Sequence, residues 1–502
     1  MRKHIPVICG ALLFIAAGAV LVLKHPGNAD EAMGRGPMES TLQQDPLSEE
    51  LAQALSVDIA SQSDQVIKLV TETGAGEDSI EALRLLAGQA GQLSLYFEEQ
   101  GDFAASAHLS TCEEIYQTLL DAYSGAISFS DGQHKLEILL GSLEGPDPYD
   151  EDTAEYRPSF SQSIEEDILF ALAACSMNAL HRQEQQENVV SITFAGDTTF
   201  GQYPEVPQEL AFDTEFARRS CDLAFPLRAM SPYFANDSFS VLNCEGTFTD
   251  SEEMQQKKFR FKGPAEYIQM FTEGHIEVVN LANNHTFDYL GQGYLDTKQN
   301  LESYGVRYYG EQEYLVYIAG DVAFGFFGYD LFNQEPEDMR HRIERDIAAV
   351  RELGAEVIIA TFHWGTEYSN EANDFQVQTA HLAVDLGADM VVGHHPHVLQ
   401  GIEVYQGKTI VYSLGNFAFG GDEERKDNGD TMLVRQTFAR DDSGEVHPLD
   451  LMVVPANVST VTDRSNYVPR PLFGDDARRV LERILDFSSR LPYGAAELAC
   501  LE

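Results

Sequence analysis

From Val189 onward, short apolar runs alternate with amphipathic segments. Runs rich in Val, Ile and Phe lie at residues 189–196, 239–245, 276–283, 356–365 and 389–398. Residues 293–305 and 340–353 instead place apolar side chains at three- and four-residue spacing, which is typical of helices that bury one face. Short, nearly continuous apolar runs are typical of strands that are buried on both faces. The alternation therefore predicts an α/β domain.

Paired strands follow the last of these runs. Residues 401–417 have the pattern of two strands joined by a turn at Gln406-Gly407, and residues 431–438 and 448–458 have the pattern of two more. Residues 475–491 have the spacing of another amphipathic helix. We assign residues 188–456 to the α/β domain and residues 457–502 to a C-terminal helical extension of that domain.

The first 187 residues do not show this alternation of strand and helix patterns. The apolar run at residues 5–23 is about as long as a helix that crosses a bilayer, and the short basic segment before it is expected to stay in the cytoplasm. We therefore predict a single-pass membrane anchor over residues 1–24 and place the bulk of the chain outside the cytoplasm. Residues 25–44 read as a linker, and residues 45–187 read as an all-helical spacer or partner-docking domain.

The charge of the chain narrows the choice of partners. Its 502 residues include 81 acidic and 33 basic side chains, which gives a formal net charge of −48. Such a surface repels nucleic acids and anionic lipid headgroups, so a nucleic-acid-binding function is disfavoured. An acidic polymer would also be repelled unless a local basic patch or bound cations intervened.

Polar side chains recur where the predicted strands end. Because sites in open α/β sheets form at the carboxyl ends of strands, we expect five such ends to build one shared site. The residues concerned are Asp197, Asn243, Glu245, Asn283, Asn284, His285, Asp288, His363, Glu367, His394, His395 and His397. Carboxylate oxygen, amide oxygen and imidazole nitrogen together suit Zn, Mn or Fe, and the set is large enough for one or two divalent ions. Two ions would polarise a phosphoryl oxygen, and a histidine outside the ligand set would protonate a leaving group.

The order of these motifs resembles the bacterial CapA family of capsule, or poly-γ-glutamate, synthesis proteins, which are related to calcineurin-like metallophosphoesterases. The resemblance covers roughly residues 190–490, more than half of the chain by ordinary domain sizes. The motifs that carry it are FAGD, LNCEG, NLANNHTFDYLGQG, FHWGTEY and GHHPHVLQGIEVYQGKTIVYSLGNF. It implies a calcineurin-like metallophosphoesterase sandwich of two mixed β-sheets flanked by helices, with a metal centre on the loops at one edge.

The resemblance also implies roles for single residues. The implied metal ligands are Asp197, Glu245, Asn284, His363, His395 and His397, and His394 is an alternative to His395. His285 is the implied acid, and Asp197 serves the reaction as well as the metal. One position departs from the phosphoesterase pattern, because Asp197-Thr198-Thr199 stands where the usual first motif is Asp-x-His. The first metal position therefore lacks one ligand.

A basic segment stands out against the acidic background. Residues 255–264 carry Arg260 and Lys262, which we interpret either as receivers of an anionic substrate or as a solvated basic face. Glu367 and His394 are further candidates for substrate contact. Glu367 can equally orient a neighbouring ligand or belong to a solvated loop.

These observations leave three functions in competition. The leading expectation is a membrane-anchored, extracytoplasmic protein of the CapA type, which acts with membrane-bound synthesis proteins on an anionic surface polymer or its precursor through a metal-dependent phosphoesterase-like site. The second is a subunit that binds the polymer or holds a synthesis complex together without catalysis. The third is a general extracytoplasmic metallophosphodiesterase.

Overall fold

The computed structural model describes residues 189–500, apart from 333–337, 422–425, 442 and 462–463, together with helix α4 (Phe103–Ser124) and a few single positions between residues 84 and 139. The predicted anchor and linker lie outside the described residues. None of the described helices combines the length and the apolar character that a bilayer crossing requires. Within the region predicted to be helical, α4 buries Leu109, Ile115 and Leu119.

A first mixed sheet contains β1 (Val190–Thr198) at its centre. Its strand order is β15 (Arg470–Pro471), β14 (Val446–Asn457), β13 (Asp430–Arg440), β1, β2 (Phe239–Cys244), β5 (Val278–Asn280) and β6 (Arg307–Tyr309), and β16 (Ala499–Cys500) also pairs with β14. Strands β1, β2, β5 and β6 run parallel, whereas β13 and β14 are antiparallel. The carboxyl ends of β1, β2 and β5 therefore lie at one edge.

A second mixed sheet has the order β11 (Ile402–Tyr405), β12 (Lys408–Val411), β10 (Met390–His394), β9 (Val357–His363), β8 (Val322–Asp330) and β7 (Leu315–Ala319). Strands β12, β10, β9 and β8 are parallel, and the outer hairpins are antiparallel. A short ribbon of β3 (Thr247–Phe248) and β4 (Lys262–Gly263) lies outside both sheets. Gln406 and Gly407 both have positive φ values, 52° and 76°, as a two-residue turn between β11 and β12 requires.

The two sheets pack face to face over a continuous apolar core. Phe194 and Val241 of the first sheet and Phe326, Ile359 and Val392 of the second all belong to this core. Burial of side chains from both faces supplies the main driving force for holding the sheets together.

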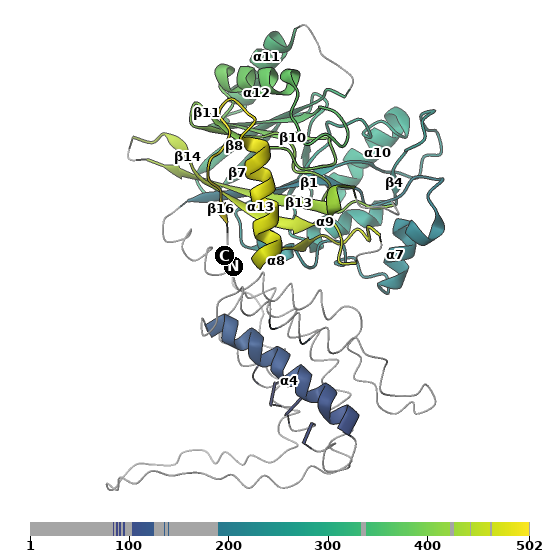
Figure 1. The fold of residues 1–502 in the computed structure, drawn as a ribbon. Helices are drawn as coiled ribbons and strands as arrows, with labels where there is room; N and C mark the ends of the chain where they lie inside the picture. The colour runs from purple at the N-terminus through teal and green to yellow at the C-terminus, as the bar shows by residue number, and fades with distance from the viewer. Residues whose placement is uncertain are drawn as a thin grey trace, which may run out of the picture. The chain divides into compact units, whose positions relative to one another are not determined.

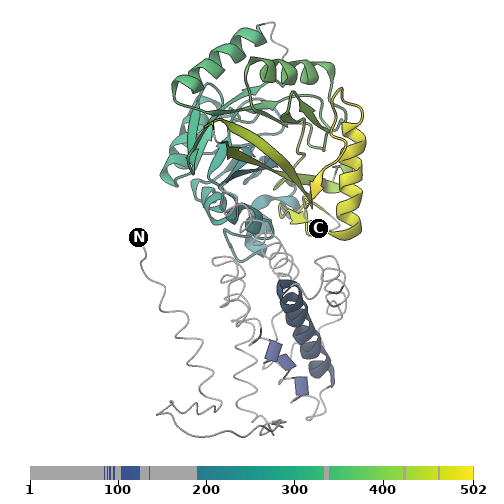
Figure 2. The same ribbon diagram turned by 90° about the vertical axis from the view of Figure 1, so that its left-hand side faces the viewer.

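Helices cover the outer faces of both sheets (Figures 1 and 2). On the first sheet, α8 (Ser231–Ala235), α9 (Gln269–Glu273) and α10 (Leu290–Ser303) share one apolar cluster with the sheet, together with α7 (Phe212–Arg218) and the 3-10 turn Ala265–Ile268. On the second sheet, α11 (Met339–Glu352) and α12 (Asp374–Leu386) do the same. Helix α13 (Gly474–Ser488) inserts Ala477, Val480 and Ile484 into the core between the sheets. The expected mixed α/β architecture with helices on both sides is confirmed.

Candidate metal centre

Residues from both sheets meet at the carboxyl ends of their parallel strands. Asp197 lies at the end of β1, and Glu245 directly follows β2. Asn284 and His285 follow β5 in the first sheet. The second sheet contributes His363 at the end of β9, His394 at the end of β10, and His395 and His397 from the next turn. The strand-end residues predicted as metal ligands therefore come together in space.

The Glu245 carboxylate lies at the centre of this group. Its Oε1 atom is 3.7 Å from His285 Nε2, 3.8 Å from His363 Nε2 and 3.9 Å from His397 Nε2. The carboxylate is fully buried, yet neither of its oxygens has a hydrogen-bond partner among the described residues. Burying a carboxylate without hydrogen-bond partners costs several kcal/mol by order of magnitude, a cost that a bound cation would offset.

A second set of atoms converges beside Glu245. His363 Nε2 lies 2.8 Å from Asn284 Oδ1 and 3.2 Å from His395 Nδ1. One amide oxygen and two imidazole nitrogens thus point at one another next to a carboxylate. Oxygen and nitrogen donors at this spacing are the ligand types that a borderline divalent ion takes.

A third set of polar atoms surrounds the Asp197 carboxylate. Its Oδ1 accepts a hydrogen bond from Asn243 Nδ2 at 2.8 Å, and its Oδ2 accepts one from the backbone N–H of His395 at 3.3 Å. His394 Nδ1 and His397 Nδ1 each lie 3.3 Å from one of the two oxygens. Asp197, Glu245 and His397 each offer one ligand atom, and these three atoms lie within 4.8 Å of one another. This spacing is compatible with a single shared ion.

The surroundings lower the pKa values of two imidazoles and raise that of the Glu245 carboxyl group. Burial and the neighbouring His395 hold the pKa of His363 well below its ordinary value, and burial with the charge of His397 lowers the pKa of His395 to about 3. Both imidazoles are therefore neutral at physiological pH, as metal ligands must be. Burial and the charge of Asp197 raise the pKa of Glu245 well above its ordinary range.

The pKa values of His397 and Asp197 change in the directions opposite to those of the other imidazoles and of Glu245. Burial alone would lower the pKa of His397, but the charges of Glu245 and Asp197 raise it to about 10. Burial likewise opposes ionisation of Asp197, but the adjacent His394 and His397 hold its pKa well below the ordinary value. The carboxylates attract positive charge strongly enough to keep a proton on a buried imidazole. A divalent cation would supply that charge instead.

His285 is held by a chain of polar contacts. Its Nδ1 lies 2.8 Å from Asp288 Oδ2, which also accepts a hydrogen bond from the Phe261 backbone N–H at 2.6 Å. The other oxygen of Asp288 forms an ion pair with Lys257 at 2.5 Å. Burial lowers the pKa of His285 despite the opposing effect of Asp288. The ring is therefore fixed with Nε2 facing Glu245.

Buried amides support the candidate ligands: Asn243 and Asn283 were expected at the site, whereas Asn280 and Asn416 were not. Asn243 Oδ1 accepts hydrogen bonds from Asn280 Nδ2 at 3.0 Å and Asn283 Nδ2 at 3.2 Å. Asn283 Oδ1 in turn accepts the backbone N–H of His285 at 3.1 Å. On the other side of the site, Asn416 Oδ1 lies 2.8 Å from His397 Nδ1. The only sequence signal for these amides is their position at or just beyond a strand end.

The four residues predicted to contact substrate lie in different surroundings. Arg260 forms an ion pair with Glu205, and Lys262 forms one with Glu252 at 3.2 Å. Their role in substrate binding stays a prediction, and it requires both to exchange these partners. His394 lies against Asp197 inside the site. Glu367 is exposed beside His395 and His397.

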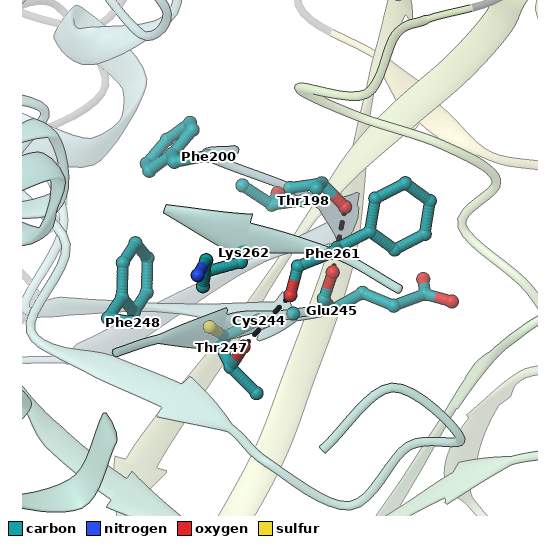
Figure 3. A pocket seen from close by; sticks show the side chains of 10 residues that line it. Thr198, Phe200, Cys244, Glu245, Thr247, Phe248, Phe261 and Lys262 are labelled. Atoms are coloured by element: carbon teal, nitrogen blue, oxygen red, sulfur yellow. Dashed lines mark hydrogen bonds between the residues drawn. The ribbon is translucent and has the colours of Figure 1, made fainter. Parts of the chain in front are cut away.

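A small cavity lies next to the centre (Figure 3). It has a volume of about 10 Å³ and is lined by residues that include Cys244, Glu245, Thr247, Phe261 and Lys262. The Glu245 carboxylate extends away from Cys244 and Thr247 in this view. A space of that size holds at most about one water molecule, so we assign no substrate to it.

Comparison with known proteins places the chain in a family. Residues 191–421 match the family model described as bacterial capsule synthesis protein PGA_cap. The PGA biosynthesis protein CapA of Bacillus subtilis (strain 168) is 30% identical over 312 residues, covering 58% of this chain and 79% of that protein. The capsule biosynthesis protein CapA of Bacillus anthracis is 28% identical over 306 residues, covering 55% and 69%.

A solved structure of Termus thermophilus sulfate thiohydrolase SoxB in complex with glycerol is also similar, with 12% identity, a TM-score of 0.28 and coverage of 60% of each chain. A likeness this distant carries no argument about function. The family match and the Bacillus relatives are sufficient by themselves. The chain belongs to the CapA family of bacterial capsule synthesis proteins.

Proposed function

We propose that this chain acts in the synthesis or export of an anionic surface polymer, such as a capsule or poly-γ-glutamate, through a metal-dependent site of the phosphoesterase type. The names of its Bacillus relatives, which refer to PGA and capsule biosynthesis, support a role in making such a polymer. The observation that carries the metal-dependent site is the Glu245 carboxylate. It is buried without a hydrogen-bond partner among the described residues and lies within 3.9 Å of nitrogens from three imidazoles.

The ligands fall into two positions that share Glu245. Asp197, Glu245 and His397 would hold one ion, and Glu245, Asn284, His363 and His395 would hold the other. Divalent ions bound there would polarise a phosphoryl or acyl oxygen and activate water. The absence of a histidine at Thr199 leaves the first position one ligand short of the usual pattern.

His285 would supply the proton in this reaction. Asp288 holds its Nδ1, so Nε2 is the atom that faces the centre, 3.7 Å from Glu245 Oε1. A group within reach of the bond to be broken, and fixed by a second carboxylate, is placed to protonate a leaving oxygen or nitrogen. Lys257 offsets the charge of Asp288 and so limits how tightly His285 holds its proton.

The location of the protein is part of the same proposal. The apolar run at residues 5–23 after a basic N-terminus supports a single membrane anchor, with the site outside the cytoplasm. Bound divalent cations would also reduce the repulsion between an acidic polymer and a chain with a net charge of −48.

The test is metal analysis of the full-length protein combined with turnover assays on phosphodiester and γ-glutamyl substrates. We expect bound Mn, Zn or Fe in the wild type, and loss of both metal and turnover in His363→Ala and His397→Ala. His341→Ala is the matched control, because this exposed histidine of α11 lies outside the site. A wild-type protein that binds no divalent metal would overturn the proposed site.

One observation favours a non-catalytic alternative. The first motif ends in Thr199 rather than histidine, which removes one ligand of the first ion, and a two-ion reaction depends on both ions being bound. In that case the protein binds polymer or organises a synthesis complex. Bound metal without turnover on any phosphoester or γ-glutamyl substrate would establish this alternative.

A further inference from the structure

Glu367 lies beside the two imidazoles that end the metal motif. Its carboxylate offers an oxygen that lies within 4.8 Å of one nitrogen of His395 and one nitrogen of His397. Glu367 itself is exposed, whereas His395 is fully buried and the His397 side chain is 10% exposed. An exposed carboxylate thus lies beside two imidazole nitrogens that are largely buried, a spacing that a cation could bridge.

Backbone hydrogen bonds fix this placement. Trp364 N–H donates to His394 O at 3.0 Å, and Tyr368 N–H donates to Pro396 O at 2.7 Å. Pro396 lies between the two histidines, so the second bond brings Glu367 over the pair. His395, His397 and Tyr368 have φ values of 96°, 59° and 61°, a conformation that costs roughly 1–3 kcal/mol for residues other than glycine. Both turns are therefore held in strained shapes that bring them together.

The far end of the same loop is anchored as well. Gln400 Nε2 donates to Ser369 O at 2.9 Å and to Glu371 O at 3.2 Å. Asn370 Nδ2 donates to Leu399 O at 2.8 Å. Hydrogen bonds on both sides of Glu367 tie its loop to the histidine loop. They therefore hold Glu367 close to the imidazoles.

The imidazole pair has an unmet polar requirement on its own side. His395 turns Nδ1 toward His363, and its buried Nε2 has no hydrogen-bond partner among the described residues. A cation held by a carboxylate from the β9 loop would give this nitrogen a partner.

We propose that Glu367 is a metal ligand of this centre, binding a divalent cation together with His395 and His397. The inference rests on the proposed metal site. It differs from a role in orienting an imidazole, because a ligand contributes negative charge and a direct bond to the ion. A glutamine at this position would keep the ability to accept a hydrogen bond but would lose the charge.

The experiment is a titration of full-length, metal-free protein with Mn²⁺, with affinity measured by calorimetry and ions per chain measured after dialysis. We expect Glu367→Gln and Glu367→Ala to weaken binding equally, by at least about tenfold, or to lose one ion per chain. Because Glu367 is exposed, both variants should fold. Glu371→Gln is the matched control, since this exposed carboxylate pairs with Arg490 at 2.7 Å, and it should behave as the wild type.

The outcomes separate the two proposals. Wild-type affinity and stoichiometry in Glu367→Gln would overturn the ligand role of Glu367 and leave the metal centre standing. A wild-type chain that takes up no Mn²⁺, Zn²⁺ or Fe²⁺ would overturn the proposed centre and this inference with it.

Discussion

Asn416 shows how a single uncharged side chain can control the centre. Its Oδ1 lies 2.8 Å from His397 Nδ1, and His397 Nε2 is the nitrogen that faces Glu245. A hydrogen bond on one ring nitrogen fixes the orientation of the ring and leaves the other nitrogen for a metal. The nitrogen that His397 turns toward Glu245 therefore depends on an uncharged neighbouring side chain.

We predict that Asn416→Ala weakens Mn²⁺ binding by about 10–100-fold, because His397 loses the partner that orients it. The measurement is a calorimetric titration of metal-free protein. Asn236→Ala is the control, since this half-buried amide donates to Pro232 O at 2.9 Å at the end of α8, outside the candidate site. An Asn416→Ala variant that binds Mn²⁺ as tightly as the wild type would show that His397 needs no such support.

Among single residues, the sequence indicates candidate ligands more readily than the side chains that hold them in place. Histidine and carboxylate side chains at strand ends are recognisable because few other roles combine those residue types at that place. Asn280 and Asn416 carry no comparable signal, because asparagine after a strand is also the ordinary residue of a turn. Only the fold reveals that Asn280 reaches Asn243, 37 residues earlier in the chain.

Among the elements, helix α13 is held to the first sheet by charge as well as by apolar contacts. Asp430, whose side chain is fully buried at the start of β13, accepts hydrogen bonds from Arg479 at 2.6 and 2.8 Å and a further one from Arg483. The same helix contributes apolar side chains to the core between the sheets. The C-terminal segment is thus an integral layer of the domain.

We predict that Asp430→Asn lowers the free energy of unfolding by about 1–3 kcal/mol, because the hydrogen bonds from Arg479 and Arg483 lose their charge assistance inside a buried site. Urea unfolding monitored by circular dichroism is the measurement. Asp475→Asn removes an ion pair at the exposed start of the same helix and should cost less than about 0.5 kcal/mol. Equal costs for the two variants would mean that Asp430 does not anchor the helix.

The pattern of apolar residues predicted the strands that carry the site, but it did not indicate strand β8. That strand contains Gly325 and Gly328, and glycine is depleted in strands. The fold requires both: a Cβ atom at Gly325 would lie 2.5 Å from Ala355 Cβ, and one at Gly328 would lie 2.8 Å from Asn280 Oδ1. Such close approaches come from tertiary packing, which periodicity within a single segment does not encode.

At the scale of the whole domain, the candidate site forms because strand ends from two separate sheets lie next to one another. Asp197 and Glu245 come from the first sheet, His363 and His395 from the second, and about 200 residues of chain separate the first of these from the last. The general rule for strand ends predicts a site at the edge of each sheet. The packing of one sheet on the other, and hence the distances between ligands, requires the three-dimensional structure.

The most direct test of the central claim is an anomalous difference map from crystals of the full-length protein soaked with Mn²⁺. We predict a peak about 2.0–2.4 Å from a Glu245 carboxylate oxygen and from His363 Nε2. A second candidate cluster, Asp441, Glu445 and His447, lies exposed on the hairpin between β13 and β14. A map with ions only at that exposed cluster, or with no peak beside Glu245, would contradict the account.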